Sequence, residues 1–146
     1  MSIEIASQAS PELVEAINAL IPQLSTSTPA LSASEVEQLL NQPSTYLFVF
    51  RSEQGDDAGA ILGMLTLATF RIPTGVRAWI EDVVVDGKAR GQGAGQKLVE
   101  AAVDHARSIG AKTVDLTSRP SREAANRLYQ RAGFQARQTN VYRYSV

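Results

Sequence analysis

Apolar residues recur along most of the chain with the spacing of helices or strands. Leu13, Ile17 and Leu20 lie on one face of a helix that begins after Ser10, a typical capping residue followed here by proline. Alternating or continuous apolar runs mark the strands. The pattern predicts, in chain order, a strand at 3–5, helices from 11 and from 33, strands at 46–50, 60–70 and 79–85, a helix from about 95 to 109, a strand at 113–117, a helix from 122 to about 132, and a last strand ending at 141–144.

Polar residues and glycines mark where several of these elements begin or bend. Ser32 and Glu35 have the spacing of a capping box, and Ser121 is placed to cap the last helix. Gly63 lies inside a long strand, where a glycine marks either a bulge or a close approach of another segment. The strand at 46–50 is apolar at every position, so we expect it to be buried on both faces.

The order of the elements, β-α-α-β-β-β-α-β-α-β, predicts the α/β class, with a mixed sheet and helices on both faces. The strand at 113–117 follows the strand at 79–85 through a helix, so we expect these two to be parallel neighbours. The whole chain, 1–146, is long enough for one domain and short for two.

A glycine-rich turn joins the strand at 79–85 to the helix that follows it. The turn reads Arg90-Gly91-Gln92-Gly93-Ala94-Gly95. The first N–H groups of a helix have no partner within the helix and carry the positive end of its dipole, and glycine lets a ligand approach the backbone. We therefore interpret the N–H groups from Gly91 to Gln96, with the charge of Arg90, as a site for a diphosphate.

Three known phosphate-binding loops were compared with this turn. The P-loop requires Lys and then Ser or Thr after its final glycine, and Gln96 and Lys97 follow Gly95 here. The dinucleotide-binding motif requires a glycine where this chain has Gln96. That motif also has an acidic residue at the end of the next strand, and this chain has Asp115 there. The third loop, Arg/Gln-x-x-Gly-x-Gly/Ala, is matched by Arg90, Gly93 and Gly95.

At these residues the chain resembles the GNAT superfamily of acetyl-CoA-dependent N-acetyltransferases. The resemblance implies acetyl-CoA as the cosubstrate and places the loop between the fourth strand and the third helix. The predicted order of elements is also that of the GNAT fold. A small dinucleotide-dependent oxidoreductase stays open as a weaker alternative.

The strand before the loop offers Val83, Val84 and Val85. Their main-chain groups could bind the pantetheine arm as an added strand would. The resemblance implies that a backbone N–H at Val83 or its neighbour stabilises the oxyanion. The alternative is that the three valines only fill the core, and the two roles are compatible because the main chain binds while the side chains pack.

A second motif covers residues 125–134 and contains Leu128-Tyr129 followed, after three residues, by Gly133-Phe134. It resembles the fourth helix of the GNAT fold and its exit. By this resemblance Tyr129 protonates the coenzyme A thiolate and also lies at the cofactor, and Asn126 hydrogen-bonds the cofactor arm. The alternative for Tyr129 is a half-buried core tyrosine.

Two adjacent carboxylates, Glu81 and Asp82, interrupt the apolar strand at 79–85. Neighbouring strand residues point to opposite faces, so only one can face a given side of the thioester. We favour Glu81 as the general base, with Asp82 second, acting directly or through water. The alternative is that one of them pairs with Arg77 or Arg71.

Composition excludes several other classes of function. The net charge is −1 and cysteine is absent, so the chain offers neither a basic surface for nucleic acid nor a thiol to carry an acyl group. One histidine, His105, cannot form a metal site alone, and we expect it to be a packed helix residue. No apolar run is long enough to span a membrane. We expect a cytoplasmic monomer or homodimer.

These observations predict an N-acetyltransferase that transfers the acetyl group of acetyl-CoA by direct attack in a ternary complex, without a metal. The acceptor would be a primary amine on a small molecule or a protein. The segments 25–34 and 135–144 would select it. The alternative is a non-catalytic acyl-CoA-binding sensor or adaptor.

Overall fold

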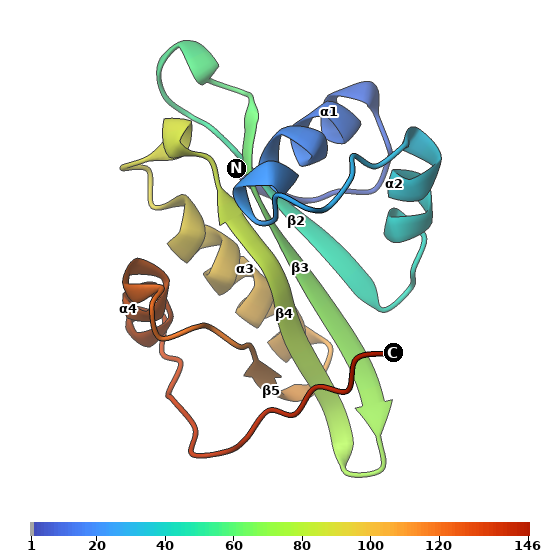
Figure 1. Ribbon diagram of the computed structural model, residues 1–146, viewed down its shortest axis with the longest axis vertical. Helices are drawn as coiled ribbons and strands as arrows, with labels where there is room; N and C mark the ends of the chain where they lie inside the picture. Colours follow the sequence, from blue (N-terminus) through green and yellow to red (C-terminus); the bar gives the residue numbers. More distant parts are fainter. Residues whose placement is uncertain (1) are drawn as a thin grey trace.

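A computed structural model describes residues 2–146 as a five-stranded sheet between two helical layers (Figure 1). The strands lie in the order β1-β2-β3-β4-β5, antiparallel except for the parallel pair β4 and β5. The predicted mixed sheet is therefore confirmed. The elements are β1 (Ile3–Ile5), α1 (Pro11–Leu20), α2 (Ala33–Leu40), β2 (Thr45–Arg51), β3 (Ile61–Ile72), β4 (Gly75–Val85), α3 (Ala94–Ser108), β5 (Ala111–Asp115) and α4 (Glu123–Arg131), with 3₁₀ turns at Ile21–Gln23, Gly55–Asp57 and Gly87–Ala89.

The two N-terminal helices begin where their capping residues predict. The Ser10 hydroxyl accepts a hydrogen bond from the N–H of Leu13 at 3.2 Å. The hydroxyl of Ser32 accepts from the N–H of Glu35, and the Glu35 carboxylate accepts from the N–H of Ser32, so the predicted capping box is confirmed. None of the helices in residues 2–146 has the length and apolar character needed to cross a bilayer.

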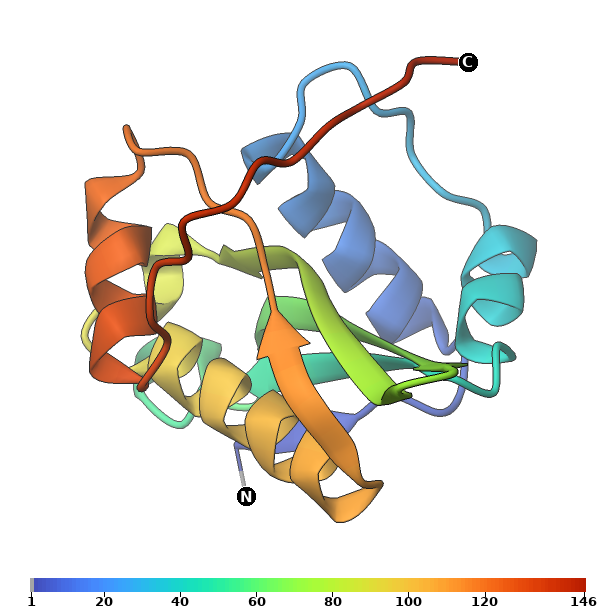
Figure 2. The same ribbon diagram turned by 90° about the horizontal axis from the view of Figure 1, so that it is seen from below.

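Helices cover both faces of the sheet, as predicted (Figure 2). α1 and α2 cover one face, and α3 covers the other, with α4 beside it. β2 lies between the two layers: its four central residues, 47–50, are all buried and alternate between the two cores. The expectation that this strand is buried on both faces is confirmed.

Gly63 marks a close approach of α3 to the sheet. A Cβ atom at this position would lie 3.3 Å from both Leu98 Cδ1 and Phe50 Cβ and 3.4 Å from the carbonyl oxygen of Val84. The register of β2 against β3 also shifts next to it, after Phe50. Both features that the sequence suggested for this glycine are therefore present.

β4 contains a bulge at its two carboxylates. Glu81 faces Thr66 of β3 and Val84 faces Met64, so β4 has one residue more than β3 between these pairs. Asp82 has φ = +52°, and it is the one non-glycine residue with positive φ in the described chain. Aspartate tolerates this conformation better than most residues. The bulge changes which residues of β4 face which helical layer.

β5 pairs with only the first half of β4. The parallel register runs from Val76 opposite Ala111 to Trp79 opposite Asp115. From Ile80 to Val85, β4 stays paired with β3, but no strand within residues 2–146 pairs with its other edge. Figure 1 shows β4 continuing beyond β5 toward the start of α3.

Two predictions for the C-terminal part were wrong. α4 begins at Glu123 with Arg122 in the cap position and no side-chain cap, so Ser121 does not cap it. The last predicted strand does not form: Tyr142 and Tyr144 alternate as strand residues do, but they are 88% and 89% exposed and pair with no other strand. A strand requires a partner, and an alternating pattern does not supply one. This segment instead ends on the side of the sheet covered by α1 and α2 (Figure 2).

The packing around Gly63 leads to a stability prediction. Replacing Gly63 by Ala should lower the free energy of unfolding by about 1–3 kcal/mol, because the fully buried Leu98 and Phe50 have no space to move. Gly87→Ala is the matched control, since a Cβ there meets no atom within 4 Å. Its free energy of unfolding should change by less than about 0.5 kcal/mol. Urea denaturation measures both, and equal effects of the two substitutions would contradict the close approach.

Candidate active site

The turn before α3 presents a set of free main-chain donors. Within residues 2–146, no group accepts a hydrogen bond from the N–H groups of Gly91, Gly93, Ala94, Gly95 and Gln96. The first helical bond is donated by Lys97 to the carbonyl of Gly93 at 3.0 Å, and no side chain caps the helix. These N–H groups lie at the positive end of the α3 dipole, where an anion is stabilised.

The glycines of the turn leave room for a ligand beside these donors. Gly91 and Gly93 have φ values of +85° and +68°, which other residues rarely adopt. A Cβ added at either position would meet no atom within 4 Å. Lys88 and Arg90 are exposed near this space, and neither forms an ion pair with another described residue. Free donors, open space and unpaired positive charge together fit a diphosphate.

Asp86 fixes the junction between β4 and the turn. Its carboxylate accepts hydrogen bonds from the N–H of Lys88 at 2.9 Å and from the side-chain amide of Gln23 at 3.1 Å. The bond from Lys88 is the main reason why the pKa of Asp86 lies below its ordinary value, with a further contribution from Gln23. The contact with Gln23, which lies 63 positions away, could not be predicted from the local pattern of residues.

The side chains of the three valines of β4 fill the core, as one of the two predicted roles requires. Val84 packs in the core under α1 and α2, whereas Val83 and Val85 pack against the core under α3. Their main chain lies in the part of β4 that has no neighbour beyond β3. The side chains therefore fill the core, and the main-chain edge remains available to an extended ligand.

Glu81 and Asp82 are both exposed at the bulge. In the described part of the chain neither carboxylate forms an ion pair or hydrogen bond, so the alternative pairing with Arg71 or Arg77 is not present. Arg77 donates instead to the Thr74 hydroxyl at 3.0 Å. The bulge interrupts the regular alternation that was expected for two adjacent strand residues. Both carboxylates are therefore accessible to an acceptor or to water.

α4 contacts the start of α3 at Gly95. A Cβ at Gly95 would lie 2.6 Å from Leu128 Cδ1 and 4.0 Å from Val85 Cγ2. The last residue of β4, the first turn of α3 and the middle of α4 thus meet at one glycine. Its lack of a side chain lets Leu128, the residue before Tyr129, lie close to the donor-rich turn.

Tyr129 is half-buried against the core under α3. Burial raises the pKa of its phenol, and the positive charge of Arg122 partly offsets this effect. The ring of Tyr129 lies 6.0 Å from that of Phe134 between centroids.

Asn126 holds the segment that leads into α4. Its side-chain N–H₂ donates to the carbonyls of Arg119 and Arg122, both at 2.9 Å. Only the side-chain oxygen therefore remains to accept a bond from a ligand. The sequence predicted a contact with the cofactor arm and did not reveal this local use of the amide.

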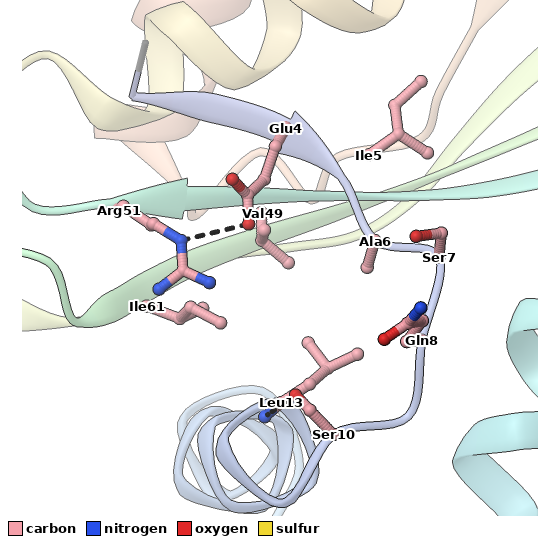
Figure 3. Close-up of a pocket in the computed structure, with 10 residues that line it drawn as sticks. All are labelled: Glu4, Ile5, Ala6, Ser7, Gln8, Ser10, Leu13, Val49, Arg51 and Ile61. Atoms are coloured by element: carbon pink, nitrogen blue, oxygen red, sulfur yellow. Dashed lines mark hydrogen bonds and ion pairs between the residues drawn. The ribbon is translucent and has the colours of Figure 1, made fainter.

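Two other features lie outside this region. His105 packs with its ring centroid 4.3 Å from that of Tyr46 and 5.9 Å from that of Phe48, as expected for a packed helix residue. A cavity of about 370 Å³ lies between β1 and the start of α1 (Figure 3). Four of the five N–H donors of the Arg51 guanidinium in this cavity are used by Glu4, Glu12 and the carbonyl of Gly59. Its charge is already balanced by two carboxylates, and none of the residues of the glycine-rich turn lines the cavity.

Comparisons with known proteins agree with this geometry. A model of the family described as "Acetyltransferase (GNAT) family" matches residues 13–134. The chain belongs to the GNAT family of acetyltransferases. The match includes β4, the glycine-rich turn and α4, so the family resemblance seen in the sequence is confirmed.

A relative of known name supports the same assignment. The chain is 35% identical to N-alpha-acetyltransferase 30 of Schizosaccharomyces pombe over 71 residues, which cover 49% of this chain and 47% of that protein. The matched part is thus about half the length of that relative.

Solved structures show the same fold over nearly the whole chain. A putative acetyltransferase from Agrobacterium tumefaciens has a TM-score of 0.84 at 24% identity, covering 99% of this chain and 100% of that one. Glucosamine-6-phosphate N-acetyltransferase from Arabidopsis thaliana has a TM-score of 0.78 at 22% identity, with 99% of each chain covered. The GNAT fold is therefore established for this chain.

Substitutions of two glycines at opposite ends of α3 can distinguish an effect on ligand binding from an effect of backbone strain. Gly93 and Gly110 both have positive φ, and a Cβ at either would meet no atom within 4 Å. Replacing either by Ala should lower the free energy of unfolding by roughly 1 kcal/mol. Only Gly93→Ala should weaken coenzyme A binding, by at least about tenfold, because it obstructs the donors. Calorimetric titration tests this, and equal affinities of the two variants would contradict the site.

Proposed function

We propose that this protein transfers the acetyl group of acetyl-CoA to a primary amine by direct attack in a ternary complex. The proposal rests above all on the five free N–H groups at the start of α3, next to the unpaired edge of β4. Family membership supports acetyl transfer in general, and the name of the S. pombe relative supports an amine as acceptor.

The residues of the turn would hold the cosubstrate at its diphosphate. The N–H groups of Gly91, Gly93, Ala94, Gly95 and Gln96 would donate to its oxygens, with Arg90 adding charge attraction. The edge of β4 along Val83–Val85 would bind the amide groups of the pantetheine arm, as an edge strand binds a peptide. Bound acetyl-CoA supplies the activated acetyl group as a thioester.

The bulge would place proton acceptors and an N–H donor close together. A backbone N–H at Val83 or its neighbour would stabilise the negative charge that develops on the thioester oxygen. Glu81 would take the proton of the attacking amine, directly or through water, and Asp82 is the second candidate. Because both carboxylates are exposed and unpaired, neither has to break an ion pair to do so.

Tyr129 would return a proton to the departing sulfur. A proton donor has to be protonated at neutral pH, as a tyrosine phenol ordinarily is, and burial raises the pKa of Tyr129 further. The side-chain oxygen of Asn126 would accept a hydrogen bond from the cofactor arm. The acceptor would enter between the segments 25–34 and 135–144.

Release of free thiol from acetyl-CoA tests the proposed reaction. Purified protein should release thiol only when an acceptor amine is present. The panel of amines to be tested contains a peptide with a free N-terminus, a lysine side chain, an aminoglycoside and glucosamine 6-phosphate. Coenzyme A binding without turnover on any amine would contradict the transferase and support a non-catalytic acyl-CoA sensor.

Replacing Tyr129 by Phe tests the role of its hydroxyl. The variant should lower kcat by about 100-fold, because protonation of the leaving thiolate is lost, while the Kd for acetyl-CoA stays within about twofold. Tyr46→Phe is the matched control, since Tyr46 packs on His105 away from the turn. If both variants keep the wild-type kcat, Tyr129 is not the acid.

A further inference from the structure

A side-chain clamp joins the glycine-rich turn to the turn between β2 and β3. The side-chain N–H₂ of Gln92 donates to the hydroxyl of Ser52 at 2.9 Å, and its side-chain oxygen accepts from the N–H of Glu53 at 3.1 Å. The two turns lie side by side in both ribbon views (Figure 1, Figure 2). The residues that meet here are 39 and 40 positions apart in sequence.

The orientation of the Gln92 amide is fixed by its partners. A backbone N–H can only donate, so the oxygen of the amide must face Glu53 and its nitrogen must face Ser52. The oxygen and the nitrogen of the Gln92 amide therefore bind two adjacent residues, Glu53 and Ser52. An amide that is hydrogen-bonded through both its oxygen and its nitrogen can neither shift nor rotate freely, and it therefore restricts the glycine-rich turn.

The Ser52 side of the clamp is rigid. Ser52 is only 3% exposed, its N–H donates to the carbonyl of Ala60 at 2.9 Å, and its carbonyl accepts from Gly59 at 2.7 Å. Its hydroxyl also lies within hydrogen-bond distance of the carbonyl and N–H of Gln54. A second link, between Lys97 and Glu53 at 3.7 Å, joins exposed side chains and contributes little.

The turn itself has few other restraints. Gln92 lies between Gly91 and Gly93, both with positive φ and neither with a side chain to pack. Its N–H makes a long bond to the carbonyl of Ala89 at 3.3 Å. Glycine loses more conformational freedom on ordering than any other residue, so a ligand that had to order this turn would bind less tightly.

We propose that Gln92 is a positioning residue for the diphosphate of the cosubstrate. It holds the turn, before the ligand arrives, in the conformation in which the N–H groups of Gly91, Gly93, Ala94, Gly95 and Gln96 are free to donate to one ligand. This inference rests on the proposed function, because it assumes that the turn binds the diphosphate of coenzyme A. Gln92 acts through the turn and does not itself have to touch the ligand.

Gln92→Met tests the clamp, because methionine keeps the length of the side chain and loses both hydrogen bonds. The Kd for coenzyme A and the KM for acetyl-CoA should both rise about tenfold, with kcat at saturation unchanged within about twofold. With S-acetylpantetheine, which has no diphosphate, kcat/KM should equal that of the wild type. Gln38→Met, on the exposed face of α2, is the control and should leave all of these values unchanged.

Ser52→Ala and the double variant test whether the two residues act together. Ser52→Ala should raise the Kd for coenzyme A, and adding Gln92→Met should raise it further by much less than the separate effects predict. Additive effects would overturn the clamp. An equal loss of activity with S-acetylpantetheine and acetyl-CoA would also overturn it, because that pattern reports general damage to the fold.

A ligand-free measurement separates this inference from the proposed function. Backbone order parameters from ¹⁵N relaxation at Gly91 and Gly93 should fall from about 0.85 in the wild type to below about 0.6 in Gln92→Met. Unchanged order parameters, or lower ones with an unchanged Kd for coenzyme A, would overturn the positioning role. If the wild type does not bind coenzyme A, the proposed function fails, and with it the role at the diphosphate.

Discussion

The structure depends on the unequal pairing of the two edges of β4. β4 is paired with β3 along almost the whole length of β4, whereas its pairing with β5 reaches only as far as Trp79. The remaining part, Ile80–Val85, is held firmly on one side and is open on the other. A ligand can therefore extend the sheet at this point without displacing any strand. The bulge at Asp82 lies within the same stretch and exposes both carboxylates beside the open edge.

The glycines around the turn meet different physical requirements. Gly91 and Gly93 provide positive φ and open space beside the free N–H groups. Gly95 has a packing role, since any side chain there would collide with Leu128 of α4. The glycines of the turn therefore leave its N–H groups accessible and let α4, which carries Tyr129, pack against the start of α3. Gln92, between the first two glycines, adds the contact that links the turn to β2 and β3.

Local patterns in the sequence predicted most of the fold. Caps at Ser10 and Ser32, the apolar run of β2 and the strand-turn-helix unit around the glycines were all found in the structure, because each depends on neighbouring residues. The final strand was predicted from alternation alone and does not form, since pairing depends on distant residues. The clamp between Gln92 and Ser52, and the exposure of Glu81 at a bulge, could not be predicted for the same reason.

An NMR titration of ¹⁵N-labelled protein with coenzyme A tests whether main-chain N–H groups at the start of α3 bind the diphosphate of the cosubstrate, as we propose. Saturable shifts should be largest at the amides of Gly91, Gly93, Ala94, Gly95 and Gln96, with smaller shifts along Val83–Val85. Coenzyme A binding with its largest shifts elsewhere, or no saturable shift at any of these five amides, would contradict the account.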